Sequence, residues 1–497
     1  MNIKKNLIIP MAGAGKRFKL AGYNTYKPFI KINKKYMVDY VLEAFPKEVK
    51  KHIITSKNLL SKSQIKYLKD KKCNIIFIAP HSKGPAYSIY KAKNKLPLSE
   101  AFFISYVDIA WVWNWKKIQP LLDEEGIIFV HRGFHPHLIE NNYSAFCKKT
   151  SNDRLIEIKE KGSFTSNHLK EDLSIGLFYV KSGHDMISGI DHIIIKDIRA
   201  GNEYFPSLIF NQLTKESKSI SLLKVDTFIH WGVPEQLEDF FYWQNTIKLL
   251  DEKQYSKKKF DTIMTMAGFG ERMKEISDKT KALINVKSLP MYKFTYKFFP
   301  AKNKYIIVTN LIKKQIKQDN KTFCYVLPKK TNSQFETIQM SNKIFKGKTN
   351  FFLISCDAFS LFDKKKFCKF VLSKKADVII FTFHPTLTQA KLSKQHTHIS
   401  SKLDKVTKIH IKSKSSEKDL GLAGFFWIKC GNTFNSVVEK IIPSNYSEEV
   451  VADHVIKKYI DLGYTVAQFQ LDNYLHIGTK NEFLEFKYWL DRKNAFA

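Results

Sequence analysis

The feature that most constrains this chain is an internal repeat, in which six short motifs of the first half return in the same order in the second half. The first motif is MAGAGKRF at residues 11–18, which returns as MAGFGERM at residues 266–273. The last is FIHWGVPEQLEDFFYW at residues 228–243, which returns as YLHIGTKNEFLEFKYW at residues 474–489. The offset therefore runs from 255 residues down to 246. A period of that size is domain-sized, so the sequence predicts two tandem domains of one fold rather than a solenoid of short repeats.

Within the first copy, short apolar runs alternate with amphipathic segments. The apolar runs predict strands, and patterns with helical spacing predict helices between them. The predicted strands are 6–10, 53–55, 75–78 and 102–105, and the predicted helices are 38–45, 60–69 and 86–96. Strands joined by helical crossovers predict an α/β fold, with a mostly parallel, mixed, Rossmann-like sheet flanked by helices. In such sheets a ligand lies at the carboxyl ends of the strands.

The two copies meet in a charged stretch, DEKQYSKKKFD at residues 251–261. Charged residues without apolar periodicity are typical of a connection between domains. We therefore expect the first domain at residues 1–252 and the second at residues 258–497, with the better-preserved motifs in the first.

The composition is strongly basic, with 82 Lys and Arg against 47 Asp and Glu and a net charge of +35. Such a charge is compatible with a nucleic-acid partner. However, the lysines are scattered in twos and threes, and the sequence has no zinc-knuckle spacing and no RNP-type aromatic motif. We expect a solvated basic surface that serves small anionic substrates, and we do not expect nucleic acid as a partner. Whether the chain forms a homo-oligomer is left open.

The chain has six cysteines, at positions 73, 147, 324, 356, 368 and 430. None of them forms a CxxC pair, which argues against a zinc site. The pattern is typical of reduced thiols in a cytoplasmic protein. No run of apolar residues approaches the length of a membrane span, so none is expected.

The first repeated motif predicts an anion-binding turn. Gly13 and Gly15 directly follow a predicted strand, where glycine lets the backbone turn sharply and approach a ligand with its amides. Lys16 and Arg17 add positive charge beside it. The turn is not a dinucleotide fingerprint, because Phe18 stands where the third glycine would be, and it is not a Walker A loop, because Arg17 follows Lys16. A tight strand-to-helix connection explains the two glycines equally well.

Residues further along the chain make the pattern more specific. Lys27-Pro28 comes ten residues after Arg17, and a predicted helix follows it. This combination resembles the N-terminal signature of the sugar-phosphate nucleotidyltransferases. Other parts of the chain are similar to further segments of that family: Asp108 after an apolar strand, and residues 81–92, 157–161, 174–180, 201–213 and 231–240. The resemblance covers nearly all of residues 6–245 and, more loosely, 260–490.

The resemblance implies transfer of a nucleotide from an NTP to a sugar 1-phosphate, with release of pyrophosphate and with Mg²⁺ as cofactor. In the family this supplies activated sugars for surface polysaccharide or capsule. The resemblance implies catalytic roles for Arg17, Lys27 and Asp108, with Asp108 binding the metal ion. It implies that the nucleotide is bound by Ala12, Gly13, Ala14, Gly15, Lys16, Gly84, Pro85 and Ala86. It implies that the acceptor is bound by Lys161, Gly176 and Glu203. The triphosphate of the NTP and the phosphate of the acceptor are both anions and must come into contact. Such a site therefore needs positively charged groups more than acid–base groups.

Two places depart from the family pattern. Many members have a second metal-binding aspartate two residues before the closing glycine, where this chain has His230 in the first copy and His476 in the second. Neutral imidazole is a poor Mg²⁺ ligand, so His230 is either a weak second ligand or a structural residue. Three tryptophans follow Asp108, and they either line an acceptor pocket or, more in keeping with their chemistry, belong to the core; they are Trp111, Trp113 and Trp115.

The second copy is less well preserved. It keeps the counterparts of the main charged and glycine positions, which are Gly268, Gly270, Arg272, Lys281 and Asp357. It loses Pro28, which becomes Ala282, and the glycine-containing segment at 84–86 becomes part of SQFETI at residues 333–338. Two interpretations stay open: a second catalytic domain, or a decayed copy kept for packing or regulation. We favour retained nucleotide binding in this copy.

Three functions remain in view at this point. The first is a nucleotidyltransferase that acts on a sugar 1-phosphate. The second keeps the chemistry but takes a non-sugar phosphate, as a phosphocholine cytidylyltransferase would. The third is a regulatory protein in which both copies bind nucleotide without turnover. The sequence does not reveal the base or the acceptor.

Overall fold

The computed structural model describes residues 4–139, 144–250, 260–268, 270–299, 301–316, 320–386, 397–402, 404–411, 420–493 and 495. By its contacts the chain divides into two compact units, Met1–Phe240 with Arg492–Ala497 and Phe241–Asp491. The division falls inside helix α8 (Pro234–Leu250), whose C-terminal part belongs to the second unit. Most of the connection expected at 251–261, namely residues 251–259, lies outside the described residues.

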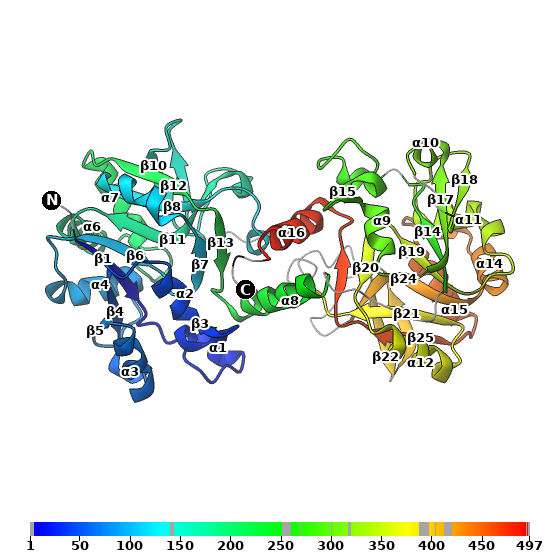
Figure 1. The fold of residues 1–497 in the computed structure, drawn as a ribbon, viewed down its shortest axis with the longest axis horizontal. Coiled ribbons are helices and arrows are strands. Elements are labelled where there is room, and N and C mark those ends of the chain that lie inside the picture. The colour runs from blue at the N-terminus through cyan, green and yellow to red at the C-terminus, as the bar shows by residue number, and fades with distance from the viewer. Residues whose placement is uncertain are drawn as a thin grey trace. The chain divides into compact units, whose positions relative to one another are not determined.

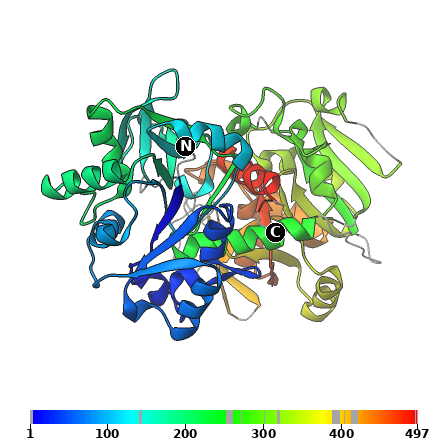
Figure 2. The same ribbon diagram turned by 60° about the vertical axis from the view of Figure 1, so that its left-hand side comes forward.

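The first unit is built on a nine-stranded mixed sheet (Figures 1 and 2). Its main path has the order β10-β9-β11-β6-β1-β4-β5, and β8 and β12 continue the sheet from β11. Strands β5, β4, β1 and β6 are parallel, whereas β11 runs antiparallel to β6, β8 and β9. The strands are β1 (Lys5–Pro10), β4 (Lys50–Thr55), β5 (Cys73–Phe77), β6 (Ala101–Ser105), β8 (Gly126–His131), β9 (Phe146–Lys149), β10 (Leu155–Lys159), β11 (Asp172–Val180) and β12 (Ile220–Lys224).

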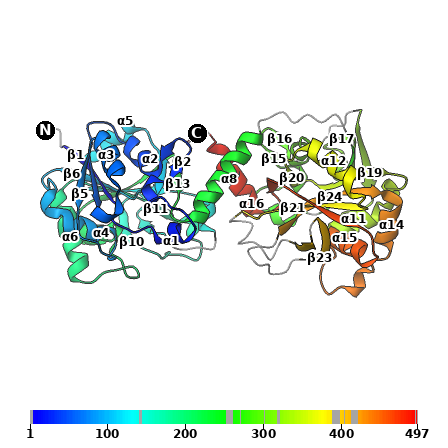
Figure 3. The same cartoon turned by 90° about the horizontal axis from the view of Figure 1, so that it is seen from below.

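Helices cover both faces of this sheet because its central strands are apolar on both sides. One face packs against helices α2 and α3, and the other against α4, α6 and α7. Figure 3 shows α2 and α3 on one side of the sheet and α4 and α6 on the other. The alternation is visible in β6, where Phe103 faces the first layer and Phe102 and Ile104 face the second. The helices are α1 (Lys16–Leu20), α2 (Met37–Glu43), α3 (Lys62–Asp70), α4 (Pro85–Ala92), α5 (Trp115–Ile118), α6 (Gly183–Ile195) and α7 (Ile209–Lys215).

The strands and helices predicted for the first copy are confirmed with shifts of a few residues at their ends. The helix predicted at 86–96 shows the largest change, because α4 ends at Ala92 and a 3-10 turn at Lys93–Lys95 follows it. The parallel strands β1 and β6 end at the same edge of the sheet, at Pro10 and Ser105. The glycine turn and Asp108 follow these two ends. Two small ribbons lie near this edge, β2 (Lys31–Ile32) with β3 (Lys35–Tyr36), and β7 (Ile109–Val112) with β13 (Thr227–His230).

The second unit has a sheet of the same strand order. Its path is β18-β17-β14-β19-β24-β21-β25-β23-β22, which corresponds strand by strand to β5-β4-β1-β6-β11-β8-β12 with the β9–β10 pair. The strands are β14 (Phe260–Thr265), β17 (Ala301–Thr309), β18 (Thr322–Leu327), β19 (Thr349–Ser355), β21 (Val378–Phe383), β22 (His398–Lys402), β23 (Lys405–His410), β24 (Leu420–Cys430) and β25 (Val466–Gln470). The same fold therefore occurs twice in the chain.

The remaining elements of the second unit also have counterparts in the first. Ribbons form between β15 (Asn285–Val286) and β16 (Leu289–Pro290), and between β20 (Ala358–Ser360) and β26 (Tyr474–His476). The helices are α9 (Met291–Tyr296), α10 (Asn310–Lys313), α11 (Gln334–Met340), α12 (Lys364–Lys374), α14 (Gly431–Glu439), α15 (Ala452–Asp461) and α16 (Lys480–Asp491). Among the described residues of both units, no helix has the length and apolar character needed to cross a bilayer.

Candidate active site in the first unit

A cavity of about 950 Å³ opens at the carboxyl edge of the first unit's sheet. Nearly all residues proposed from the sequence border it: Ala12, Gly13, Ala14, Gly15, Lys16, Arg17, Lys27, Gly84, Pro85, Asp108, Lys161, Gly176, Glu203 and His230. The exception is Ala86, which is fully buried and whose amide donates a hydrogen bond to the Tyr204 carbonyl at 3.0 Å. The strand order therefore brings segments from positions 10 to 236 of the chain to one cavity.

The turn between β1 and α1 is built around Gly15. Its φ of +63° and ψ of 32° lie in the left-handed region, which costs a residue with a Cβ about 1–2 kcal/mol. A Cβ placed there would lie 3.5 Å from the Lys27 Cβ, so the turn rests directly on that lysine. Helix α1 then buries Phe18 and leaves Lys16 and Arg17 exposed at the cavity.

Lys27 joins three segments that are far apart in the sequence. Its Nζ lies 2.6 Å from Asp108 Oδ2 and donates a hydrogen bond to the Gly232 carbonyl at 3.0 Å. The same ammonium lies 5.0 Å from the centre of the Phe18 ring. Asp108 is held from the other side, because its carbonyl accepts a hydrogen bond from the Trp231 amide at 2.8 Å. The pair is mostly buried, with side-chain exposures of 14% for Lys27 and 19% for Asp108.

The charges around Asp108 fix its ionisation. Burial alone would raise the pKa of Asp108, but the Lys27 ammonium and His230 outweigh it and bring the pKa to about 2. Burial lowers the pKa of His230 to about 4, and the attraction of Asp108 offsets this only in part. At neutral pH the site therefore holds an ionised carboxylate beside a neutral imidazole. Among the described residues, no ion pair joins His230 to Asp108.

A second wall of the cavity is made where the start of α4 meets the loop before α7. Gly84 has a φ of +89° and a ψ of 174°, a conformation that only glycine adopts readily. A Cβ on Gly84 would lie 2.7 Å from the Glu203 Cβ, and the Tyr204 amide donates to the Lys83 carbonyl at 2.9 Å. The segment that leads into α4 is also fixed internally, because His81 Nε2 lies 3.0 Å from Ser88 Oγ. His81 and Ser88 border the cavity but carried no individual signal in the sequence.

Gly176 allows an aromatic ring to lie against the backbone of β11. A Cβ at Gly176, whose φ is +82°, would lie only 2.4 Å from the Tyr106 ring. The hydroxyl of Tyr106 is buried, and among the described residues it has no hydrogen-bond partner. Burial raises the pKa of Tyr106 well above its usual value, and nearby carboxylates add to the effect. The hydroxyl therefore stays protonated and can bond a ligand in the cavity.

Two carboxylates lie on the same side of the cavity as Tyr106. Glu203 was expected from the sequence as an acceptor-binding residue, whereas Glu160 was only part of the family-like segment at residues 157–161. Ser207 Oγ donates a hydrogen bond to Glu160 at 2.5 Å, and Lys161, whose φ is +53°, places its Nζ 3.5 Å from the Ala200 carbonyl. Burial raises the pKa of Glu160 to about 7, against the opposing effects of Ser207 and Lys161.

The three tryptophans after Asp108 pack in the hydrophobic core and do not line an acceptor pocket, so the interpretation that the sequence favoured is confirmed. Trp111 is buried, and Trp113 and Trp115 pack against the same hydrophobic cluster. The Phe45 ring contacts all three, and Trp113 Nε1 donates to the Ala44 carbonyl at 3.0 Å. None of the three borders the cavity. Trp111 is buried and the other two are half-buried because this segment packs beside the end of α2, an arrangement that local sequence patterns do not show.

The donor set fits Mg²⁺ only in part. Among the described residues, no group of three or more His, Cys, Asp or Glu side chains is arranged to hold a metal ion. Mg²⁺ is commonly bound by one or two carboxylates together with substrate phosphates. Asp108 is ionised and borders the cavity, so it can supply one carboxylate ligand. His230 offers a nitrogen, which Mg²⁺ disfavours.

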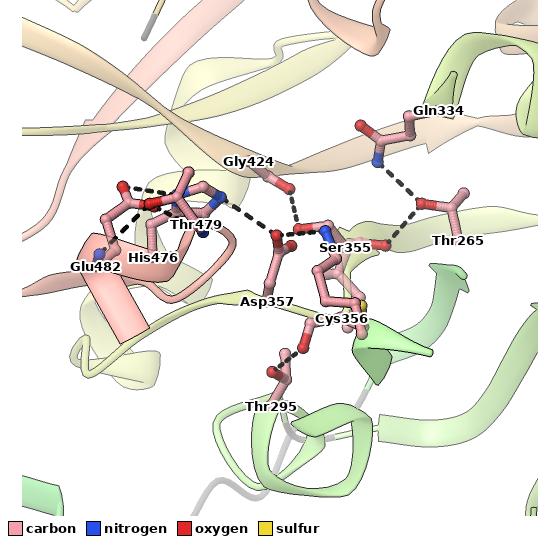
Figure 4. A network of polar contacts seen from close by, with 12 residues as sticks. Thr265, Thr295, Gln334, Ser355, Cys356, Asp357, Gly424, His476, Thr479 and Glu482 are labelled. Carbon is pink, nitrogen blue, oxygen red and sulfur yellow. Dashed lines mark hydrogen bonds and ion pairs between the residues drawn. The ribbon is translucent and has the colours of Figure 1, made fainter. Parts of the chain in front are cut away.

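The second unit repeats part of this geometry. Gly270 has a φ of +67° and a Cβ there would lie 2.9 Å from the Lys281 Cβ, as Gly15 lies against Lys27. Lys281 Nζ lies 2.8 Å from Asp357 Oδ2, and Arg272 is exposed on the turn. Gly268 forms a bridge with Thr331. Gln334 stands in the second unit at the position that Pro85 has in the first. It donates a hydrogen bond to Thr265 Oγ1 at 3.0 Å (Figure 4).

Comparison with known proteins gives one family match and several distant structures. Residues 7–142 match the family model of the MobA-like NTP transferase domain. Among curated proteins, none has a sequence similar enough to match. Similar solved structures include a nucleoside-diphosphate-sugar pyrophosphorylase from Vibrio cholerae, with 16% identity, 47% of this chain and 98% of that chain covered and a TM-score of 0.39. An inositol-1-phosphate CTP transferase from T. maritima has 14% identity, 48% and 97% coverage and a TM-score of 0.39.

The family match covers the segment that carries most of the site. Residues 7–142 contain the glycine turn, Lys27, the start of α4 and Asp108, which the fold gathers around the cavity. Residues 7–142 of the first unit are thus similar to the MobA-like NTP transferase domain, and this match supports a nucleotidyltransferase-type activity for that unit.

Proposed function

We propose that the first unit transfers a nucleotide from an NTP to a sugar 1-phosphate and releases pyrophosphate. The observation that carries this proposal is the Lys27–Asp108 pair at the floor of a cavity that has cations and glycine amides on one side. On the other side lie two carboxylates and a buried phenol without a partner. The first side suits a triphosphate, and the second suits the hydroxyl groups of a sugar.

In the proposed reaction, an oxygen of the acceptor phosphate attacks the α-phosphorus of the NTP. The bond between the α-phosphorus and the bridging oxygen breaks in line, and pyrophosphate leaves. The Gly13–Gly15 turn and Arg17 hold the β- and γ-phosphates, and Lys27 orients the α-phosphate. Lys161 binds the acceptor phosphate, and Glu160, Glu203 and Tyr106 orient the rest of the acceptor. Mg²⁺ held by Asp108 and the phosphates would neutralise part of their charge.

A second acceptor class also has support from the site. The Glu160 and Glu203 carboxylates lie near the rings of Tyr106 and Phe205, and the Lys161 ammonium lies 4.9 Å from the centre of the Phe205 ring. Carboxylates and aromatic rings also bind cationic groups, so a phosphorylated amino alcohol such as phosphocholine remains the alternative acceptor. A role in capsule or surface polysaccharide synthesis and a cytoplasmic location are proposed along with the sugar acceptor. The free state of all six cysteines supports a reducing compartment.

The test is pyrophosphate release by the full chain with Mg²⁺, four NTPs, and a panel of sugar 1-phosphates and phosphocholine. We expect release with one NTP and one acceptor class. Asp108→Asn should lower kcat roughly 10²–10³-fold, as expected for loss of a group that stabilises charge in the transition state. The matched control is Asp226→Asn, because Asp226 is an exposed aspartate that directly precedes β13 and lies outside the cavity.

Different results would move the assignment in defined directions. Release with phosphocholine but with no sugar 1-phosphate would favour the alternative acceptor. NTP binding without release from any pair would favour a regulatory role without turnover. Equal losses from Asp108→Asn and Asp226→Asn would contradict the assignment of the reaction to this cavity.

A further inference from the structure

The two units differ at an equivalent position near the start of the helix that follows each site's histidine, Gln236 in the first unit and Glu482 in the second. Helix α8 of the first unit and helix α16 of the second begin in the same way, four residues after a histidine at the end of a short strand. Near the start of α8, Gln236 Oε1 accepts a hydrogen bond from the Val233 amide at 3.2 Å. Near the start of α16, Glu482 Oε2 accepts one from the Thr479 amide at 3.1 Å. A neutral amide in the first unit is thus replaced by a carboxylate in the second.

The carboxylate of Glu482 has a direct effect on His476. Both of its oxygens lie 2.8 Å from His476 Nδ1, and the other ring nitrogen, Nε2, lies 3.3 Å from Asp357 Oδ2 (Figure 4). Both nitrogens of this ring therefore face carboxylate oxygens. A neutral imidazole has only one N–H, so it would direct a lone pair at one of these anions, whereas an imidazolium donates to both. The geometry therefore favours the imidazolium.

The first unit lacks this arrangement. Gln236 carries no charge, and among the described residues no ion pair joins His230 to Asp108. Burial opposes a charge on His476, but Glu482 and Asp357 outweigh it and raise its pKa to about 9. The His476 ring thus lies between two carboxylates, whereas a neutral amide stands at the position of Glu482 in the first unit.

Asp357 is also less accessible than Asp108. Its Oδ2 contacts both Lys281 and His476, and a Cβ at Gly478 would lie 2.2 Å from that oxygen. The exposure of its side chain is 4%, against 19% for Asp108. A metal ion at Asp357 would have to lie beside two cations and displace one of them, and a second positive charge at that distance is strongly unfavourable in a buried site.

We propose that Glu482 closes the second site to divalent cations, because it holds His476 as a cation against Asp357 in the place that the first site leaves open to Mg²⁺. The second unit is then unable to carry out metal-dependent transfer, although its turn and Lys281 are kept. Catalysis is confined to the first unit. Whether a unit binds the metal ion is decided by the residue at this equivalent position, which is Gln236 in the first unit and Glu482 in the second. This inference rests on the proposed function for the meaning of the Asp108 site, but the Glu482 effect can be tested by itself.

The test maps bound metal directly in the full chain. Fe²⁺ replaces Mg²⁺, and ascorbate with peroxide then cleaves the backbone next to the bound ion; mass spectrometry locates the cuts. In the wild type we expect cuts near Asp108 that excess Mg²⁺ suppresses, and none above background near Asp357. Glu482→Gln should produce new, Mg²⁺-sensitive cuts near Asp357, at least several-fold above background, and adding Asp357→Asn should remove them.

The reciprocal change supplies the matched control in the other unit. Gln236→Glu should hold His230 as a cation and reduce cutting near Asp108 several-fold. It should reduce pyrophosphate release in parallel, while Glu482→Gln leaves release by the first unit unchanged. If Glu482→Gln unfolds the second unit, as circular dichroism would show, His476→Gln removes the same cation and should open the same site.

Three outcomes would overturn the inference. These are wild-type cuts near Asp357 as strong as those near Asp108, no cuts near Asp357 in either folded second-unit variant, and unchanged cutting near Asp108 in Gln236→Glu. Failure of the proposed function gives a different pattern. In that case pyrophosphate release is absent with every substrate pair, whereas Glu482→Gln still opens Asp357 to the metal ion.

Discussion

At the scale of single residues, the first site depends on positions where the backbone approaches another segment closely. Gly84 and Gly176 both have positive φ, and a Cβ at either one would collide with the Glu203 segment or with the Tyr106 ring. Glu160 is a second kind of special residue, because it is a carboxylate whose burial raises its pKa to about 7. The shape and the charge of this side of the cavity, to which we assign the acceptor in our proposal, therefore depend on a few atoms contributed by distant parts of the chain.

Gly84→Ala should destabilise the first unit and weaken NTP binding. The strained backbone costs about 1–3 kcal/mol, and the contact with Glu203 and the Tyr204 backbone adds to that. The control is Gly22→Ala, because Gly22 has a similar φ of +87° but open space around its Cβ position. Pulse proteolysis in urea, with fragments assigned to each unit, measures the two losses. If Gly84→Ala and Gly22→Ala lower the stability of the first unit equally, the close contact between the start of α4 and the Glu203 loop does not limit the side chain at position 84.

Stability of the first unit should depend on pH through Glu160. Its folded pKa of about 7 lies above the ordinary value of 4.5. The folded state therefore binds the proton more tightly, and this contribution is complete below about pH 4.5 and is lost as the pH rises through 7. We expect the free energy of unfolding to fall by about 1–3 kcal/mol over that range in the wild type relative to Glu160→Gln. Urea unfolding at pH 5 and pH 8 tests this, and parallel pH profiles for the two proteins would contradict it.

At the scale of elements, helix α8 has two different parts. Its first turn carries Gln236 at the cavity, whereas its C-terminal part packs within the second unit. There Trp243 Nε1 donates to Glu485 at 3.2 Å, and its ring stacks on Trp489 with the centroids 6.4 Å apart. Tyr242 also donates to the Tyr474 carbonyl at 2.8 Å. The folding unit that contains β14 to α16 thus begins before the charged stretch that follows α8.

Trp243→Ala should therefore destabilise the second unit rather than the first. Loss of a buried tryptophan typically costs about 3–5 kcal/mol. Trp243→Phe keeps most of the packing and loses the bond to Glu485, so it should cost less, about 1–2 kcal/mol. Hydrogen exchange of β24 and β25, compared with that of β1 and β6, locates the effect. Faster exchange confined to β1 and β6 would show that the whole of α8 belongs to the first unit.

At the scale of the whole molecule, the same fold occurs in both units, but the equivalent positions 236 and 482 differ in charge. The two sheets have the same strand order, and each unit keeps the glycine turn against a lysine that pairs with an aspartate. The net charge of +35 is shared by both units and does not distinguish them. The difference is local, because Glu482 together with Asp357 raises the pKa of His476, whereas the first unit has the uncharged Gln236 at the position of Glu482.

The sequence by itself determined the α/β fold, its repetition, and the turn, Lys27 and Asp108 of the first site. These depend on local periodicity, on glycine at a sharp turn and on the order of motifs, all of which are read along the chain. Only the tertiary structure decided that Ala86 is buried, that the tryptophans pack in the core, and that Glu160 and Tyr106 border the cavity. It also decided that Glu482 reaches His476. These facts depend on distances of a few ångströms between segments that only strand order and packing bring together.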